Sequence, residues 1–217
     1  MKKIYLDSHV EIQGFSARHY DRMMDVMFFG SYKRFIKSAI KAMEIKPGEN
    51  ILDLGCGTGR NSRIMHNYCK DEGYILGIDI SEEMQDQFVK KFKEYSNIEF
   101  KQSRIDVPLN LDRKFDTVFM SFVLHGLPHE ARLKVVKNIF DNLKPGGRFC
   151  LLDFSEFKLD EIPKLHKKIF TTIECKYAFE FVERDWKEIL SENGFTDFKE
   201  KFWIKKYVRL LTAYKNV

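Results

Sequence analysis

A short apolar strand that runs directly into a glycine-rich turn constrains the fold of this chain more than any other feature. Residues 50–54 read NILDL, the next five are Gly55-Cys56-Gly57-Thr58-Gly59, and residues 60–69 can then form a helix. Glycine accepts positive φ angles and carries no Cβ, so a ligand can approach the bare backbone of such a turn. The unit is typical of α/β folds that bind a nucleoside or nucleotide at the end of a strand.

Strands and helices alternate along the rest of the chain. The expected strands cover residues 50–54, 74–80, 98–102, 115–121, 148–154, 197–204 and 207–214, and the expected helices cover residues 33–43, 60–69, 82–95, 130–143 and 185–193. We therefore predict a Rossmann-like, doubly wound α/β fold whose seven-stranded, mostly parallel sheet has helices on both faces. The 217 residues suffice for one such domain, residues 46–217, after an N-terminal helical extension over residues 1–45.

The spacing of the glycines narrows the choice of ligand. The pattern is G-x-G-x-G, whereas enzymes that bind NAD use G-x-G-x-x-G, and the G-K-[ST] of a phosphate-binding loop is missing. The turn also has no lysine or arginine to neutralise a pyrophosphate. Asp79 ends the second strand, where a carboxylate can accept hydrogen bonds from both hydroxyls of a ribose. The sequence therefore favours a nucleoside ligand without phosphates.

Four segments carry a family resemblance: ILDLGCGTGR, GIDISEEM, KFDTVFMSFVLHGL and LKPGGRFCLLDFS, in this order over roughly residues 50–155. Together they resemble the motif series of class I S-adenosylmethionine-dependent methyltransferases. Within that class, ARHYDRMMDVMFFGSYKRFI before the turn and GGRFCLLDFS after it are similar to the C-methyltransferases of quinone biosynthesis and their small-molecule relatives. The resemblance implies a methyltransferase that uses S-adenosyl-L-methionine and releases S-adenosyl-L-homocysteine.

The resemblance also implies which residues bind the cofactor. They are Tyr20, Asp53, Gly55, Cys56, Gly57, Gly59, Asp79, Ile80, Met84, Arg104, Ile105 and Ser121. The three glycines would shape the turn under the methionine moiety, with Asp53 near its ammonium group. Asp79 would bind the ribose, and Ile80 and Met84 would lie against the adenine.

The adenine contact after the third strand departs from the family pattern. Many relatives have an acidic residue there that holds the adenine amino group, but this chain has Arg104 at that position and Asp106 two residues later. We expect Ile105 to contact the adenine, and Arg104 and Asp106 remain candidates for polar contacts with it.

Two residues are candidates for catalysis. Tyr20, followed by Asp21, lies where related enzymes fold a helical lid over the cofactor, and its ring could exclude water and touch the sulfonium. Alternatively, Tyr20 only packs the extension onto the sheet. His125 follows the fourth strand, at the edge where reactive groups gather, so it is the candidate general base, although it could equally be a hydrogen-bonded loop histidine. His129 is expected to start the next helix.

The methyl acceptor stays open, because the resemblance weakens beyond residue 155. The aromatic residues of that region (Phe170, Tyr177, Phe179 and Phe181) fit either an apolar pocket wall or the core. We expect a small-molecule acceptor, such as a quinone precursor or another amphiphile. The alternatives are an RNA methyltransferase, which the basic residues of helix 33–43 and of the C-terminal tail would serve, and a phospholipid head-group N-methyltransferase.

The composition limits the cellular location and the partners that we expect for the protein. Its four cysteines lack C-x-x-C spacing, so the sequence predicts neither a disulfide framework nor a zinc site. No run approaches the ~18 apolar residues of a membrane span, so we expect a cytoplasmic protein, as a monomer or homodimer. The net charge of +5 is concentrated near the C-terminus, which would allow peripheral contact with an anionic membrane surface or only a solvated edge strand. Nucleic acid is the less favoured partner, because no nucleic-acid-binding domain is recognisable.

Overall fold

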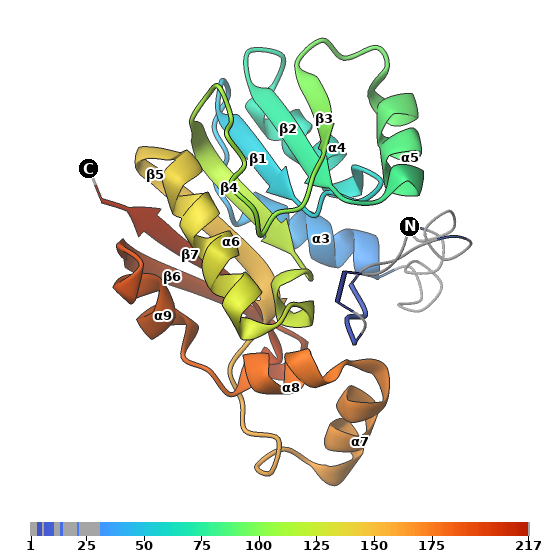
Figure 1. The fold of residues 1–217 in the computed structure, drawn as a ribbon, viewed down its shortest axis with the longest axis vertical. Coiled ribbons are helices and arrows are strands. Elements are labelled where there is room, and N and C mark those ends of the chain that lie inside the picture. Colours follow the sequence, from blue (N-terminus) through green and yellow to red (C-terminus); the bar gives the residue numbers. More distant parts are fainter. Residues whose placement is uncertain (1–3, 6, 11–13, 15–20, 22–30, 217) are drawn as a thin grey trace.

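The chain folds around one seven-stranded sheet. The computed structural model describes residues 4–5, 7–10, 14, 21 and 31–216. The strands are β1 (Asn50–Leu54), β2 (Tyr74–Asp79), β3 (Ile98–Gln102), β4 (Phe115–Ser121), β5 (Leu143–Phe154), β6 (Phe195–Trp203) and β7 (Val208–Lys215). They lie in the order β3-β2-β1-β4-β5-β7-β6, with the first five parallel and β7 antiparallel to both its neighbours (Figure 1). The predicted fold class is confirmed.

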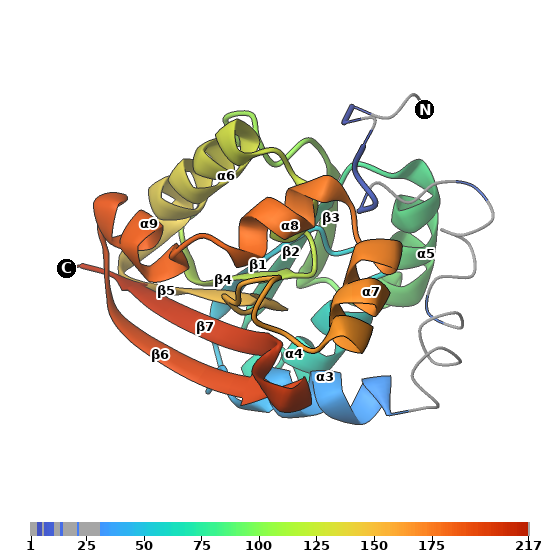
Figure 2. The same cartoon turned by 90° about the horizontal axis from the view of Figure 1, so that it is seen from below.

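Helices cover both faces of the sheet. They are α3 (Tyr32–Lys41), α4 (Arg60–Cys69), α5 (Glu82–Phe92), α6 (His129–Asn142), α7 (Lys164–Ile173), α8 (Lys176–Val182) and α9 (Trp186–Glu192), with short 3-10 turns η1 (Leu124–Gly126) and η2 (Ile204–Lys206). Helices α6 and α9 lie on one face and α3 and α4 on the other (Figure 2). Successive side chains of β1 point to opposite faces, so Leu52 and Leu54 join the core under α6, whereas Ile51 joins the core under α3.

Most predicted boundaries agree with the structure to within a few residues, because local signals set them. Ser81 caps α5, its hydroxyl accepting a hydrogen bond from the Met84 N–H at 3.4 Å. Helix α6 begins at His129 as predicted. The exception is β5, expected over residues 148–154, because it begins at Leu143 and includes residues 145–147 (Pro-Gly-Gly). The chain is already extended at Leu143, which pairs with Phe115 and starts the strand early.

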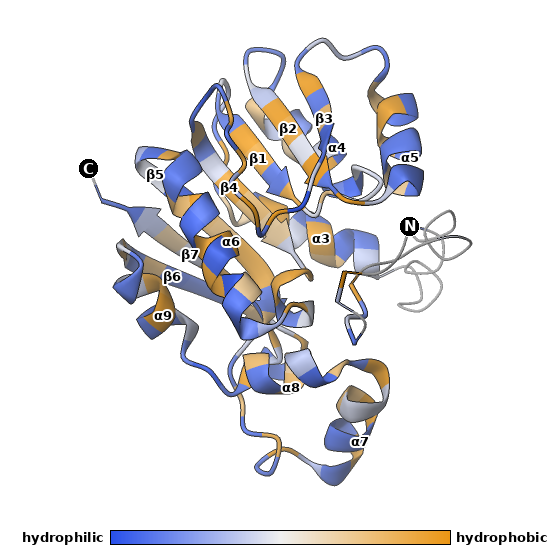
Figure 3. Cartoon of the chain, viewed as in Figure 1, coloured by the Kyte–Doolittle hydropathy of each residue, from blue (hydrophilic) through white to orange (hydrophobic). Residues whose placement is uncertain are grey.

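The region between β5 and α9 was not assigned from the sequence and forms α7 and α8. Both helices lie beyond the carboxyl ends of the parallel strands (Figures 1 and 2). Helix α8 buries Ala178, Phe181 and Val182, whereas α7 has no buried residue and mixes apolar with polar side chains (Figure 3). No helix in the described part of the chain is long and apolar enough to cross a membrane.

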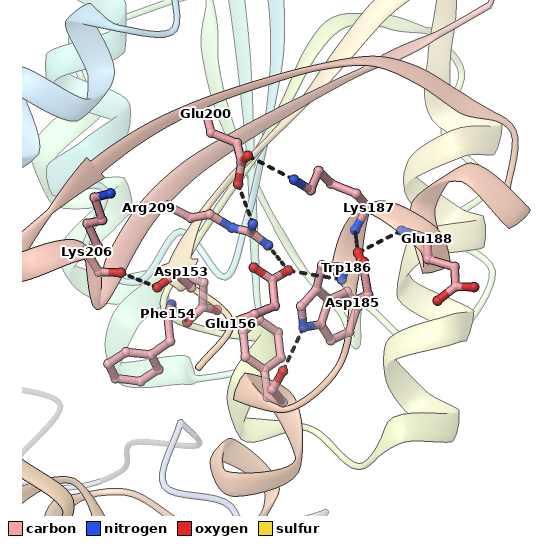
Figure 4. Close-up of polar contacts among 12 residues, drawn as sticks. Asp153, Phe154, Glu156, Asp185, Trp186, Lys187, Glu188, Glu200, Lys206 and Arg209 are labelled. Atoms are coloured by element: carbon pink, nitrogen blue, oxygen red, sulfur yellow. Dashed lines mark hydrogen bonds and ion pairs between the residues drawn. The ribbon is translucent and has the colours of Figure 1, made fainter. Parts of the chain in front are cut away.

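A buried arginine fixes where this insertion leaves the sheet. Arg209 on β7 is only 2% exposed, and its guanidinium donates to Glu156, just after β5, and to Glu200 on β6 (Figure 4). Glu156 also accepts the backbone N–H of Trp186 at 3.1 Å, and Lys187 donates to Glu200. One charge network therefore ties the end of β5 to β6, β7 and the start of α9.

Candidate functional site

A cavity of about 700 Å³ lies at the carboxyl edge of the sheet. Seven of the residues predicted from the sequence line it: Gly55, Gly57, Asp79, Ile80, Met84, Ser121 and His125. The strand ends bring them together, because parallel strands finish at the same edge. The opposite wall comes from α3, the α7 region and η2.

The three glycines of the turn have different tasks. All have positive φ: 73° at Gly55, 52° at Gly57 and 75° at Gly59. A Cβ on Gly57 would meet nothing closer than the Met84 sulfur at 3.8 Å, so its bare face is open to a ligand. A Cβ on Gly59 would lie 2.5 Å from the Phe92 ring, so that glycine lets α4 pack closely on α5 and does not line the cavity.

Asp79 is held at the cavity by backbone donors. Its Oδ2 accepts the Gly57 N–H at 2.8 Å and its Oδ1 accepts the Ser81 N–H at 3.0 Å. Burial raises the pKa of Asp79, and these N–H donors partly offset that effect. Each oxygen keeps lone-pair capacity for a further donor, so ligand hydroxyls could bind there and stabilise the charged form.

Asp53 and Cys56 are not on the cavity wall, so their contact with the cofactor stays a prediction. Asp53 is 1% exposed, and the Ser62 hydroxyl donates to it at 2.6 Å from the first turns of α4. Burial, opposed by this hydrogen bond and reinforced by the charge of Asp79, raises the pKa of Asp53 to about 7. Cys56 is buried beneath the turn, where a Cβ on Gly77 would meet its sulfur at 2.7 Å. Both side chains therefore support the turn from below.

A second, smaller cavity of about 80 Å³ adjoins Asp79 and Ile80 and holds the remaining predicted contacts. Ile105, Arg104 and Asp106 line it. The Arg104 guanidinium donates to both carboxylate oxygens of Asp106, and the Tyr5 hydroxyl donates to Oδ2 at 2.6 Å. Although burial opposes it, these donors keep the pKa of Asp106 below its usual value. An ionised carboxylate thus stands beside the position predicted for adenine.

His125 is bound on both sides of its ring. Its Nδ1 lies 2.7 Å from Oδ1 of Asp153 and its Nε2 lies 3.4 Å from Oε2 of Glu174. Burial alone would lower the pKa of this ring, but the charges and hydrogen bonds of the two carboxylates raise it to about 10. At neutral pH the ring is therefore an imidazolium with no free lone pair. This geometry argues against the general-base role predicted for His125 and favours a charged, hydrogen-bonded histidine.

Part of the N-terminal extension covers the site. His9 and Val10 line the main cavity, and the Ser8 hydroxyl donates to the Gly126 carbonyl at 2.8 Å. Further along, Asp21 accepts a hydrogen bond from the Thr58 hydroxyl at 3.0 Å, directly over the glycine turn. Tyr20 lies outside the described residues, so its place in a lid stays a prediction.

The sequence reading missed most of the opposite wall. Phe154, Phe157, Phe170 and Tyr207 line the cavity in edge-to-face contact, with ring centroids 5.1 to 5.4 Å apart. Of the aromatic residues noted beyond residue 155, only Phe170 lines the cavity, whereas Phe181 stacks on Trp186 in the core. The helical spacing of the apolar residues between 162 and 173 was the available signal for this wall.

Comparison with known proteins fits this arrangement. The model of the ubiE/COQ5 methyltransferase family matches residues 9–178, which is most of the chain and includes the glycine turn, Asp79 and α7. The chain belongs to the ubiE/COQ5 methyltransferase family. Membership accounts for the glycine turn, the aspartate at the end of β2 and the order of motifs predicted from the sequence.

Individual relatives agree with the family match. A demethylmenaquinone methyltransferase of Listeria monocytogenes is 33% identical over 140 residues, 63% of this chain but only 58% of the relative's own length. A demethylmenaquinone methyltransferase of Staphylococcus carnosus is 28% identical over an alignment of 230 positions, which covers 96% of this chain and 92% of that protein. Among solved structures, a magnesium protoporphyrin IX methyltransferase of Synechocystis with bound SAH has a TM-score of 0.63 at 24% identity, over 86% and 84% of the two chains. That likeness shows the fold.

Proposed function

We propose that this protein transfers a methyl group from S-adenosyl-L-methionine to a carbon atom of a quinone precursor. The main observation behind this proposal is that the bare face of Gly57 and the carboxylate of Asp79 line the same cavity as an aromatic wall. The named activity of the Staphylococcus relative, aligned over nearly its whole length, supports this acceptor. It also favours a quinone precursor over RNA or a phospholipid head group.

The residues present fit this cofactor. Asp79 has acceptor capacity for the ribose hydroxyls, Ile80 and Met84 offer apolar surface for a purine, and Asp106 lies beside them as a hydrogen-bond acceptor. Gly57 leaves space where any side chain would intrude. The bound cofactor would supply a methyl group already activated on a sulfonium, so the protein mainly needs to orient the two reactants and exclude water.

The aromatic wall suits a flat, apolar acceptor. Phe154, Phe157 and Phe170 face the glycine turn across one cavity, and its volume falls within the range of small-molecule sites. Ring edges and faces can hold an aromatic substrate in a fixed plane. These side chains would therefore present one ring carbon to the methyl group.

A hydroxyl proton that leaves the acceptor needs a nearby base. We do not assign that role to His125, because both its nitrogens face carboxylates. Glu174 is the carboxylate on the cavity wall beside it. We place proton acceptance at Glu174, with the His125 imidazolium holding that carboxylate in position.

Calorimetric titration with S-adenosyl-L-methionine and S-adenosyl-L-homocysteine tests the cofactor site. We expect Asp79→Asn to weaken binding by roughly 10- to 100-fold, because Asn keeps one acceptor oxygen and loses one hydrogen bond to a charged group, which is worth about 1.5 to 3 kcal/mol. Asp71→Asn is the matched control, since the Asp71 side chain is 93% exposed. Equal affinities for the two variants, or no binding by the native protein, would refute the site.

Incubation with labelled methyl donor tests the acceptor. A short-chain demethylated quinol, a phospholipid head group and RNA are offered in parallel. Label on a ring carbon of the quinol is the expected result. Label on either of the other two acceptors alone would replace the quinone proposal while leaving the cofactor site intact.

A further inference from the structure

Helix α7 carries an exposed apolar stripe at the mouth of the cavity. Leu165, Ile169 and Ile173 follow one another at four-residue spacing, so they share one side of the helix. They are 67%, 49% and 57% exposed. Ile169 and Ile173 line the cavity, whereas Leu165 lies outside the lining. The stripe therefore runs from the cavity interior onto the outer surface of the protein.

The turn η2 continues this apolar edge. Ile204 is 52% exposed and also lines the cavity. Residues 204–206 all have positive φ, 49°, 53° and 70°, a conformation that is strained for an isoleucine. The turn is joined to α7 by a hydrogen bond between His166 Nδ1 and the Tyr207 hydroxyl at 2.8 Å. We call Leu165, Ile169, Ile173 and Ile204 the cavity rim.

Exposed lysines accompany the cavity rim. Lys164 and Lys168 lie on α7, and Lys205 and Lys206 lie in η2. None of these four takes part in an ion pair among the described residues, whereas the nearby acids Asp160 and Glu161 are paired with Lys167 and Lys158. The rim thus combines aliphatic side chains with uncompensated positive charge.

We propose that the cavity rim docks on the surface of an anionic lipid bilayer. Aliphatic side chains flanked by lysines are the pattern of helices that lie in a membrane interface, with apolar groups in the acyl region and ammonium groups among the lipid phosphates. Because the stripe continues into the cavity, a docked rim opens the cavity directly to the bilayer. An amphiphilic acceptor then enters without crossing water. RNA would engage the lysines but leave the aliphatic stripe exposed, so the bilayer accounts for both features.

Cosedimentation with vesicles tests docking without any assay of methyl transfer. The probes are vesicles of phosphatidylcholine alone and of phosphatidylcholine mixed with phosphatidylglycerol. We expect binding to the mixed vesicles only, weakening as salt is added. Leu165→Gln should weaken it by roughly tenfold or more through lost apolar burial, and Lys168→Glu by a similar factor. Val89→Gln, at a 52% exposed valine of α5, and Lys134→Glu, on α6, are matched controls expected to bind like the native protein.

A polarity-sensitive dye locates the contact. The four native cysteines are buried, so a dye on Leu165→Cys should report an apolar environment when mixed vesicles are added, and one on Val89→Cys should not. Absence of binding at low ionic strength, or binding that both controls weaken as much as the rim variants, would overturn the proposal. The proposal would also be overturned if the protein bound RNA in preference to mixed vesicles and Leu165→Gln left that RNA binding unchanged. Calorimetry with the methyl donor on the same variants separates these outcomes from failure of the cofactor site.

Discussion

The charge on His125 can be measured through its effect on stability. Its pKa rises from 6.5 to about 10 in the folded protein because Asp153 and Glu174 hold the protonated ring. Below pH 6.5 the ring is charged in both the folded and unfolded states, and its full stabilisation is present. That stabilisation is lost as the pH rises through about 10. At about 1.4 kcal/mol per pH unit, it amounts to at most roughly 5 kcal/mol.

His125→Asn removes this pH dependence. The difference in the free energy of unfolding between the native protein and the variant should therefore shrink by roughly 2.5 kcal/mol between about pH 7 and pH 9, as measured by urea denaturation. His129→Asn is the control, because burial lowers the pKa of His129. The contribution of His129 to the free energy of unfolding should fall only as the pH drops below about 6.5, so its pH dependence has the opposite sign to that of His125.

Proton NMR of the His125 ring supplies the direct measurement. We expect the ring to keep the chemical shift of an imidazolium up to at least about pH 9. A ring that titrates near its ordinary pKa of 6.5 would refute the reasoning, because Nε2 would then carry a free lone pair at neutral pH. The general-base role predicted from the sequence would be restored, and proton acceptance at Glu174 would lose its basis.

Two further predictions concern the turn and the scaffold. Gly57→Ala and Gly48→Ala both place a side chain at positive φ with no protein atom closer than 3.8 Å, so each should cost about 1 kcal/mol of stability. Only Gly57→Ala should also reduce affinity for the methyl donor in calorimetry, and equal affinities of the two variants would contradict the assigned ligand position. Arg209→Met should lower the free energy of unfolding by about 3 kcal/mol in urea, because it removes the ion pair of the partly buried Glu156 and leaves Glu200 paired with Lys187. Lys187→Met, at the exposed end of the same network, should cost less than about 1 kcal/mol, and similar costs for the two variants would show that the network adds little.

The half of the site that we propose for the cofactor could be predicted from the sequence because its signals are local. The glycine turn lies within five consecutive residues, and Asp79 lies at the end of the strand that follows α4. Strand alternation then fixes that both reach one edge of the sheet. Even there, residue type alone did not separate a ligand contact from a packing contact. Gly57 and Gly59 are equivalent in sequence, yet only the rings of Phe88 and Phe92 make Gly59 a packing glycine.

The acceptor half could not be predicted, because its contacts join distant parts of the chain. His125 follows β4, Asp153 ends β5 and Glu174 follows α7, so their meeting depends on the whole sheet and on the path of the insertion. For this reason the sequence alone could not weigh the base role predicted for His125. A histidine at a strand end is a plausible base until two carboxylates from elsewhere in the fold occupy its nitrogens.

The two halves of the cavity should therefore respond differently to substitution. The cofactor half is built on strand ends and backbone N–H groups, which few side-chain changes disturb. The acceptor half rests on α7, a helix with no buried residue, and on η2, a strained turn. Side-chain contacts hold both in place, such as His166 to Tyr207, Glu174 to His125 and Phe170 to Phe154. Such elements can change sequence without unfolding the sheet, because little of the core depends on them. The same scaffold can thus keep its site for the methyl donor while its acceptor wall changes.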